Sequence, residues 1–293
     1  MARRRRKPSE SSTDEPQSRK IESPGRAWDS TIIEQIDIPG CSSNFAIHEK
    51  MSDDSWWTRC DLQFPDPHGR GILVPMKKTL WPLSGRPVEY ASDEQLFKEN
   101  LQFLDYHLEV RDKRCYTVMG SYVFLTWRIE EFDVVPYLHF LGPPNTGKTK
   151  ALELLELLCY RGWRITHPTV AVVFFVVNLY SPTLLADNYE FWPKETRNEL
   201  DGLFNAGYRK GGVVPRRPRS GEFGPELLIY EVFCPKALAG TRLPVESLAS
   251  RCIIIRMTRS QREIPIRIDM KWAQELRSKL LWYRFQHFQR RKT

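Results

Sequence analysis

One short segment restricts the fold of this chain more than any other feature. Residues 142–149 match the pattern G-x-x-x-x-G-K-[ST], and they separate an apolar, strand-like run at 137–141 from a helix-like run that begins at 150. A glycine-rich turn in that setting points successive backbone N–H groups at one anion, and the helix N-terminus adds partial positive charge. The setting therefore predicts a phosphate-binding loop in an α/β sheet. Its expected lining residues are Gly142, Pro143, Pro144, Asn145, Thr146, Gly147, Lys148, Thr149 and Lys150.

Two side chains of this loop have distinct expected roles. The Lys148 ammonium would reach the β- and γ-phosphates of a nucleotide, and the Thr149 hydroxyl would hold Mg²⁺. The average frequencies of these residue types predict a chance match roughly once in a hundred chains of this length. We therefore expect the chain to bind a nucleoside triphosphate, with ATP and Mg²⁺ as its ligands.

A second acidic position is needed to hold the metal, and residues 183–187 supply it as an apolar run that ends in Asp187. The next residue, Asn188, can orient a water molecule but cannot take its proton, and a general base typically contributes about 10²–10⁴-fold to a rate. Glu190 lies two residues further on. Two interpretations stay open: either Glu190 acts as the base, or it is a surface carboxylate and the enzyme is slow or inactive.

The pattern after Pro136 alternates between strands and helices, which is typical of a parallel α/β sheet that binds ligands at the carboxyl ends of its strands. We predict a three-layer α/β sandwich with a central, mainly parallel sheet. The stretch 170–180 has strand-forming residues, but its place between two strands favours a helix. The predicted strands are 137–141, 163–166, 183–187, 227–233 and 252–257.

Composition divides the chain into four regions. Residues 1–27 are rich in Ser, Pro, Arg and Glu, and we expect a disordered basic tail. Residues 28–110 form a small mixed, β-rich accessory region whose closing helix starts at a capping box, residues 92–95. Residues 111–269 form the nucleotide-binding domain, and residues 270–293 a basic amphipathic helix. Most of the apolar residues of that helix are expected to face the core; they are Trp272, Leu276, Leu280, Tyr283 and Phe285.

The net charge of +8 is unevenly distributed. Basic clusters occupy 3–7, 290–292 and the loop 209–219, which follows an aromatic residue, Tyr208. Such clusters suit polyanions, and the loop suits a nucleic-acid backbone with one stacking contact; the alternative is that they only solvate the surface. No apolar run approaches the ~20 residues of a membrane span. The six cysteines show no zinc or disulfide spacing, so we expect a cytoplasmic protein without a membrane partner.

Residues 122–268 resemble the AAA+-type ATPase domains found with primase and helicase modules of phages, plasmids and mobile elements. Three segments carry the resemblance: 136–149, then 182–187 with 203–208, and finally 232–240 with 243–252. The family usually has Asp-Glu-Ala-Asp where this chain has Asp-Asn-Tyr-Glu at 187–190. That departure bears on hydrolysis and leaves nucleotide binding untouched.

The resemblance implies an ATPase that acts on nucleic acid, as a helicase-like motor or its loader, with a separate primase or replication partner. It also implies that Arg251 projects into the nucleotide site of a neighbouring copy, which requires a homo-oligomer, and that Lys236 senses the γ-phosphate. A surface ion pair and an ordinary structural lysine are the alternatives for these two residues. For the whole protein, the alternatives are a nucleotide-gated binding module with little hydrolysis, or a small-molecule kinase.

Overall fold

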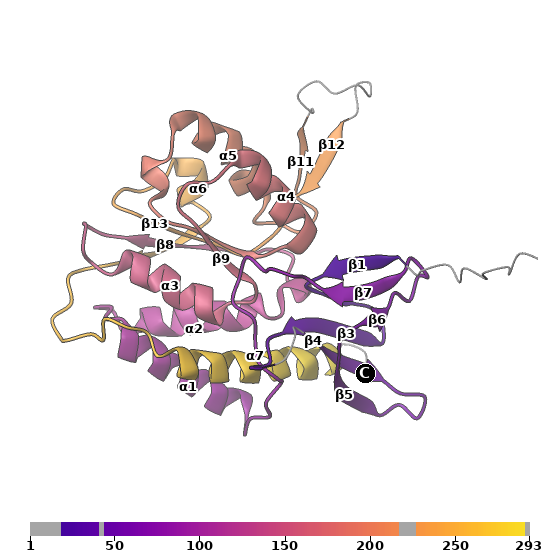
Figure 1. Ribbon diagram of the computed structural model, residues 1–293. Coiled ribbons are helices and arrows are strands. Elements are labelled where there is room, and N and C mark those ends of the chain that lie inside the picture. Colours follow the sequence, from indigo (N-terminus) through magenta and orange to yellow (C-terminus); the bar gives the residue numbers. More distant parts are fainter. Residues whose placement is uncertain (1–18, 41–43, 217–226, 291–293) are drawn as a thin grey trace, which may run out of the picture.

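A computed structural model describes residues 19–40, 44–216 and 227–290 (Figure 1). Its centre is a five-stranded sheet in which every neighbouring pair of strands is parallel. The expected α/β class and the parallel sheet are therefore confirmed. In spatial order the strands are β14 (Cys252–Arg256), β8 (Tyr137–Leu141), β13 (Lys236–Gly240), β10 (Thr183–Ala186) and β9 (Gly162–Ile165).

Helices cover both faces of this sheet. The connection from β8 to β9 crosses the sheet in one direction, and every later connection returns in the other. Because parallel crossovers are right-handed, the first connecting helix must lie on the face opposite to the later ones, as Figure 1 shows. The first is α3 (Lys148–Leu158), and the later ones are α4 (Val170–Tyr180), α5 (Lys194–Ala206) and α6 (Glu246–Ala249).

Each face of the sheet has its own apolar core, because successive side chains of a strand point to opposite faces. On β8, Leu138 and Phe140 pack into the core on the α3 side, whereas Tyr137 packs into the core under α4 and α5. All three are fully buried. The carboxyl ends of the strands therefore form one edge that is held from both sides.

The predicted strand 227–233 is wrong as a member of this sheet. Its residues form β12 (Leu228–Glu231), which among the described strands pairs with β11 (Val213–Arg216) alone, in an antiparallel hairpin. The fourth strand of the sheet is β13, whose five residues are all buried. β-propensity measures fit to a half-buried pleated surface, so the apolar run at 227–233 resembled a core strand although much of β12 is exposed.

The accessory region contains two small sheets that pack against each other. One has the order β2 (Gly25–Ala27), β3 (Thr31–Ile36), β4 (Asn44–Lys50), β5 (Trp56–Asp61), and the other has β1 (Lys20–Ser23), β7 (Ile72–Pro75), β6 (Phe64–Pro65). Ile33, Phe45 and Leu73 fill the space between them. Residues 20–27, expected in the disordered tail, form β1 and β2 because they pair with this region; residues 1–18 lie outside the described residues.

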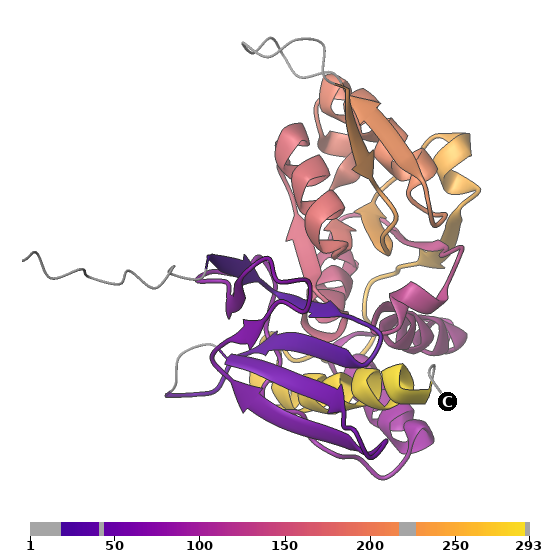
Figure 2. The same cartoon turned by 90° about the vertical axis from the view of Figure 1, so that its right-hand side faces the viewer.

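A helical layer joins the accessory region to the central sheet. It comprises α1 (Asp93–His107), α2 (Arg114–Thr126), the short η1 (Ile129–Glu131) and α7 (Met270–Arg290). Ser92 Oγ accepts a hydrogen bond from the Gln95 amide at 3.1 Å, so the predicted cap of α1 is present. In Figure 2, α7 lies along the accessory strands. Its Leu276, Leu280, Tyr283 and Phe285 are buried as expected, whereas Trp272 is only half-buried.

None of the helices in the described part of the chain has the length and the apolar character needed to cross a membrane.

Candidate functional site

The predicted phosphate loop connects β8 to α3 at the carboxyl edge of the sheet. Asn145 and Gly147 both adopt positive φ angles, of 61° and 83°, which turn the backbone sharply before the helix. Gly147 is the N-cap of α3, and within the described chain no side chain caps that helix. The first N–H groups of α3 therefore remain available to an anion.

Gly142 opens the loop at a point where two other strands end. Its amide donates to the Gly240 carbonyl at 3.2 Å, at the end of β13. A Cβ on residue 142 would lie 2.4 Å from the carbonyl oxygen of Met257, which directly follows β14. Only glycine fits, so the pattern requires this residue for close packing of the backbone.

The two lysines of the loop have different surroundings. Lys148 is 8% exposed, and its Nζ donates to the Pro143 carbonyl at 2.6 Å. Burial lowers the pKa of this ammonium, while Glu190 and Asp187 act in the opposite direction. Lys150 points away and donates to the carbonyls of Ile266 and Pro265 at 2.7 and 3.3 Å. Lys150 therefore anchors the segment after β14 rather than reaching into the loop.

The two residues expected to hold Mg²⁺, Thr149 and Asp187, lie together. Thr149 Oγ1 donates to Asp187 Oδ1 at 3.3 Å, and Asp187 is buried where β10 ends. Arg164 Nη1, on β9, lies 3.8 Å from the second carboxylate oxygen of Asp187, and Arg164 also pairs with Glu156 of α3 at 3.0 Å. Sequence reasoning missed Arg164, because only the pairing of β9 with β10 places it beside Asp187.

Glu190 lies at the border of the phosphate loop, in the short helix η2 (Tyr189–Phe191). Its Oε1 accepts a hydrogen bond from the Thr241 amide at 2.5 Å. A Cβ on Gly240 would be 2.5 Å from its Oε2, so the carboxylate rests on the glycine backbone that also holds Gly142. This carboxylate is therefore part of the site, and its placement requires glycine at position 240.

The neighbours of Glu190 differ in what they offer the site. Asn188 follows Asp187 with a φ of 54°, a conformation that asparagine tolerates better than most residues. His139 on β8 is buried, and among the described residues its Nδ1 has no hydrogen-bond partner. Burial lowers the His139 pKa to about 4, with an opposing contribution from Glu190. His139 is therefore neutral at pH 7 and adds no charge to the site.

A cleft of about 260 Å³ adjoins Glu190 on the α5 side. Arg242 lines it, two residues beyond the end of β13. Sequence reasoning missed this arginine because it placed the fourth strand at 227–233; a residue just past a central strand would otherwise have been a candidate, since ligands bind outside the carboxyl ends of strands.

Lys236 is not at the phosphate site. It is the first residue of β13, fully buried, and its Nζ donates to the carbonyls of Gly207, Val232 and Cys234 at 3.0, 3.1 and 3.0 Å. The loop is at the other end of the parallel strands, about 15 Å away at ~3.3 Å per residue. The predicted sensor role is wrong, because the position depended on the misplaced fourth strand.

Arg251 also lies at the amino edge of the sheet, directly before β14. Its guanidinium stacks over the Tyr208 ring at 4.8 Å. Within one chain, therefore, Arg251 does not meet the phosphate loop. The same contact covers Tyr208, the residue expected to stack on a base.

The basic segment 209–219 is not a single flexible loop. Lys210 Nζ donates to the Glu130 carbonyl at 2.9 Å. Arg216 belongs to β11, stacks on Phe174 at 4.2 Å and donates to Glu199 at 3.1 Å. Residues 217–219 lie outside the described residues. Two cations of the expected nucleic-acid contact, Lys210 and Arg216, therefore also make contacts within the protein.

The loop fits a phosphate by its uncapped helix start, its buried lysine and its strained turn. Fewer protein side chains are available to hold a metal ion than to bind a phosphate. In the described ranges, no group of three or more His, Cys, Asp or Glu side chains is arranged to hold a metal ion. Mg²⁺ would therefore depend on Thr149, Asp187, nucleotide oxygens and water, a ligand set that this ion commonly takes.

No protein-family model matches the chain, and no curated protein matches it.

Proposed function

We propose that this chain binds ATP at the loop of residues 142–149 and hydrolyses it. The observation that carries the proposal is the meeting of four polar side chains from two separate segments at one edge of the sheet. Lys148 and Thr149 begin α3, whereas Asp187 and Glu190 come from the segment directly after β10, where Glu190 rests on the end of β13. The strand connections reverse direction beside β8, which is where open α/β sheets bind ligands.

The roles of these residues follow from their chemistry. Lys148 would exchange its bond to the Pro143 carbonyl for a phosphate oxygen, and the open N–H groups of α3 would bind the same anion. Thr149 and Asp187 would hold Mg²⁺, which supplies charge neutralisation between the phosphates. Arg164 fixes the second oxygen of Asp187.

Glu190 is the residue we assign as general base. Its carboxylate can accept a proton, whereas Asn188 carries an amide that cannot. The Thr241 amide and the missing Cβ of Gly240 hold its carboxylate next to the loop. In this assignment Asn188 orients a water molecule, and Glu190 takes its proton as the water oxygen attacks the γ-phosphorus of ATP; the bond from that phosphorus to the bridging oxygen breaks, and ADP leaves.

We further propose that the protein is an AAA+-type ATPase that acts on nucleic acid as a helicase-like motor or its loader, beside a separate primase or replication partner in the cytoplasm. The parallel order of the five strands supports the family. The distance between Arg251 and its own loop supports action on a neighbouring copy, and hence a homo-oligomer. Exposed Arg209, at the root of the hairpin, supports contact with a polyanion.

The second candidate is a nucleotide-gated binding module that turns over little. Asn188 is the observation that favours it, because this residue occupies the position where the family usually has glutamate. An Asn188→Glu variant that gains turnover sharply would support this candidate.

The test is ATP hydrolysis by the purified full chain with and without single-stranded DNA. Turnover that DNA stimulates, and that Lys148→Ala and Glu190→Gln abolish, is the expected result. ATP binding without turnover in either condition would exclude the motor and leave the gated module.

A further inference from the structure

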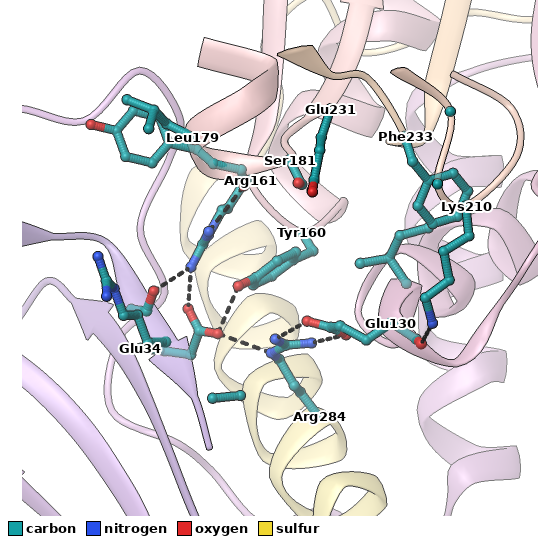
Figure 3. Close-up of a pocket in the computed structure, with 17 residues that line it drawn as sticks. Glu34, Glu130, Tyr160, Arg161, Leu179, Ser181, Lys210, Glu231, Phe233 and Arg284 are labelled. Atoms are coloured by element: carbon teal, nitrogen blue, oxygen red, sulfur yellow. Dashed lines mark hydrogen bonds and ion pairs between the residues drawn. The ribbon is translucent and has the colours of Figure 1, made fainter. Parts of the chain in front are cut away.

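A second cleft, of about 360 Å³, opens at the opposite edge of the sheet, where the accessory region meets the central domain (Figure 3). Its walls come from β2, the carboxyl end of α4, and the turn 210–212. Its floor consists of Glu34, Glu130, Tyr160, Arg161 and Arg284. The floor is of interest because Tyr160 and Arg161 follow the C-cap of α3, the helix that begins at the phosphate loop.

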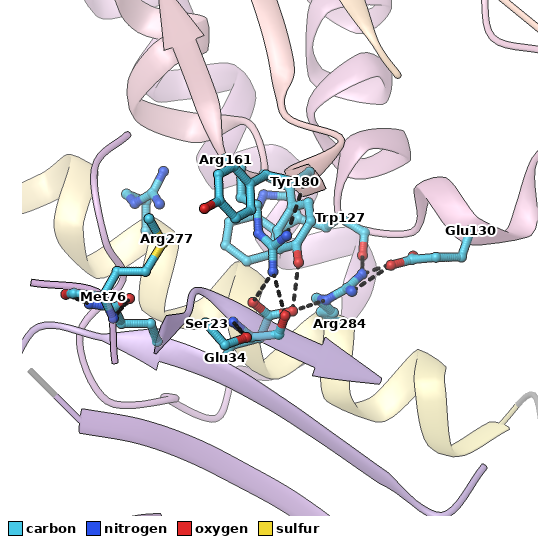
Figure 4. Close-up of polar contacts among 12 residues, drawn as sticks. Ser23, Glu34, Met76, Trp127, Glu130, Arg161, Tyr180, Arg277 and Arg284 are labelled. Carbon is cyan, nitrogen blue, oxygen red and sulfur yellow. Dashed lines mark hydrogen bonds and ion pairs between the residues drawn. The ribbon is translucent and has the colours of Figure 1, made fainter. Parts of the chain in front are cut away.

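One carboxylate of the accessory sheet holds this floor together. Glu34, on β3, accepts hydrogen bonds from Tyr160 Oη at 2.7 Å, Arg284 Nε at 3.0 Å and Arg161 Nη2 at 3.2 Å (Figure 4). Arg284 also donates to Glu130 at 2.6 and 3.0 Å. Burial opposes ionisation of Glu130, but Arg284 prevails and lowers its pKa to about 2. The charges of the floor satisfy one another, so they require no ligand.

Helix α7 connects the end of α3 to the accessory region by a second route. Arg277 lies seven residues before Arg284 on α7, and residues two turns apart share one face of a helix. Its guanidinium donates to the Leu157 carbonyl at 2.7 Å and also to the carbonyl of Pro82 in the accessory region. Trp127 Nε1 donates to the Leu158 carbonyl at 2.8 Å. The unpaired carbonyls at the end of α3 are thus bound by side chains of the helical layer.

The backbone at this junction is strained. Arg161 and Ser181 have φ angles of 49° and 43°, in the left-handed region that β-carbon sterics disfavour. Arg161 Nη1 donates to the carbonyl of Tyr180, the residue before Ser181, at 3.0 Å. Strained residues persist only where the surroundings hold them, and they are concentrated at switch regions among other functional sites.

We propose that Glu34 is a positioning residue that couples occupancy of the phosphate loop to the accessory sheet. The proposal rests on the function proposed above. A phosphate that replaces the Pro143 carbonyl at Lys148 changes the start of α3, and α3 is a rod of 11 residues, about 16 Å long. Its other end carries Tyr160 and Arg161, so a small displacement there changes the contacts of Glu34. The strained junction then relaxes, and the positions of β2 and β3, which border the cleft, change.

The test is hydrogen–deuterium exchange of the full chain with and without ATP·Mg²⁺, read at two places. In the wild type, ATP is expected to slow exchange at residues 142–150 and to change the exchange rates at residues 25–36 at least 5-fold, the lower end of typical allosteric coupling. In Glu34→Gln, the effect at 142–150 persists, whereas the effect at 25–36 disappears. Glu49→Gln, in the same small sheet but paired with Arg59, is the matched control and retains both effects.

Glu34→Gln leaves Arg161 without its paired carboxylate and Arg284 with Glu130 alone, so Tyr160→Phe provides a milder variant. It removes only the hydroxyl that donates to Glu34 and is expected to reduce the change at 25–36 severalfold. An ATP effect at 25–36 that is the same in all these variants would overturn the coupling and leave nucleotide binding intact. The absence of any ATP effect at 142–150 in the wild type would overturn the proposed function, and the coupling with it.

Discussion

At the scale of single residues, the candidate site depends on positions where a side chain is absent. The Gly142 amide donates a hydrogen bond to the Gly240 carbonyl, and neither residue has space for a Cβ. The space at Gly240 is taken by the carboxylate of Glu190. The glycine thus determines where the proposed base lies, although it takes no part in chemistry.

Gly240→Ala is therefore expected to displace Glu190 and to lower ATP turnover by about 10²-fold or more, the usual contribution of a general base. ATP binding should persist, because Lys148 and the start of α3 are unchanged. Steady-state hydrolysis and calorimetric binding measure the two effects. Gly202→Ala on α5 is the control, since its Cβ would meet only Val214 at 3.4 Å. Unchanged turnover in Gly240→Ala would remove Glu190 from the mechanism.

Two buried histidines make stability depend on pH. Burial lowers the pKa values of His48 and His139 from 6.5 to about 4. The unfolded chain therefore binds more protons between these values, and the stabilisation present above pH 6.5 is lost as the pH falls towards 4. At about 1.4 kcal/mol per pH unit, each histidine contributes about 3 kcal/mol. His48 stacks between Trp56 and Phe285, so His48→Phe retains the stacking.

We expect urea unfolding of the wild type to lose stability from pH 7 to pH 5, and His48→Phe to lose distinctly less. An identical pH dependence in both proteins would show that His48 does not titrate in this range.

At the scale of elements, the amino end of β13 explains why the predicted γ-phosphate sensor role of Lys236 is wrong. Lys236 binds three backbone carbonyls with a buried ammonium and faces Tyr137 at 5.0 Å. Burial lowers the pKa of this lysine, and the neighbouring Cys234 acts against that effect. The residue thus closes the turn before the strand, at the edge of the sheet away from the phosphate loop.

Lys236→Met should lower the free energy of unfolding by several kcal/mol, since each buried carbonyl left without a donor costs about 1–3 kcal/mol. The ATP affinity of the folded fraction should not change. Chemical denaturation and nucleotide titration test this pair of outcomes. A variant of normal stability that loses turnover would restore the sensor interpretation.

Some elements could be predicted because local pattern and tertiary burial agree. Strand β8 and helix α4 have the predicted bounds, and α4 was identified from its place between two strands rather than from propensity. The hairpin could not be predicted, because the large apolar residues at 227–233 fit a core strand better by residue type than the small residues of β13, and only the tertiary structure shows which of the two is buried. Asp187 and the phosphate loop could be recognised because each is a local pattern in the sequence. The positions of Glu190 and Arg164 depend on which strands pair and in which register, and the sequence pattern does not show that.

At the scale of the whole molecule, the accessory region and the central sheet share one apolar core. Ile32 and Ala46 of the accessory strands, Leu280 of α7 and Leu155 of α3 belong to the same buried cluster. His48 stacks on Phe285 of α7 at 5.1 Å. Within the described residues, the accessory strands, the central domain and α7 therefore share a core.

Thermal unfolding should accordingly show one cooperative transition. Leu280→Ala, at a fully buried position, is expected to cost about 2–5 kcal/mol and to shift that single transition as a whole. Circular dichroism and tryptophan fluorescence should report the same midpoint, and Lys271→Ala at an exposed position should leave it unchanged. Two transitions, with only one of them shifted, would mean that the regions fold separately.

Every role proposed for this protein depends on nucleotide binding at the loop of residues 142–149. The most direct test is calorimetric titration of the full chain with ATP·Mg²⁺, compared with Lys148→Ala and with Lys98→Ala, which removes an exposed lysine of α1. Binding of one ATP per chain is expected, about 10–100-fold weaker in Lys148→Ala, as suits the loss of a charged hydrogen bond, and unchanged in Lys98→Ala. Equal affinity in all three proteins, or no binding in any of them, would contradict it.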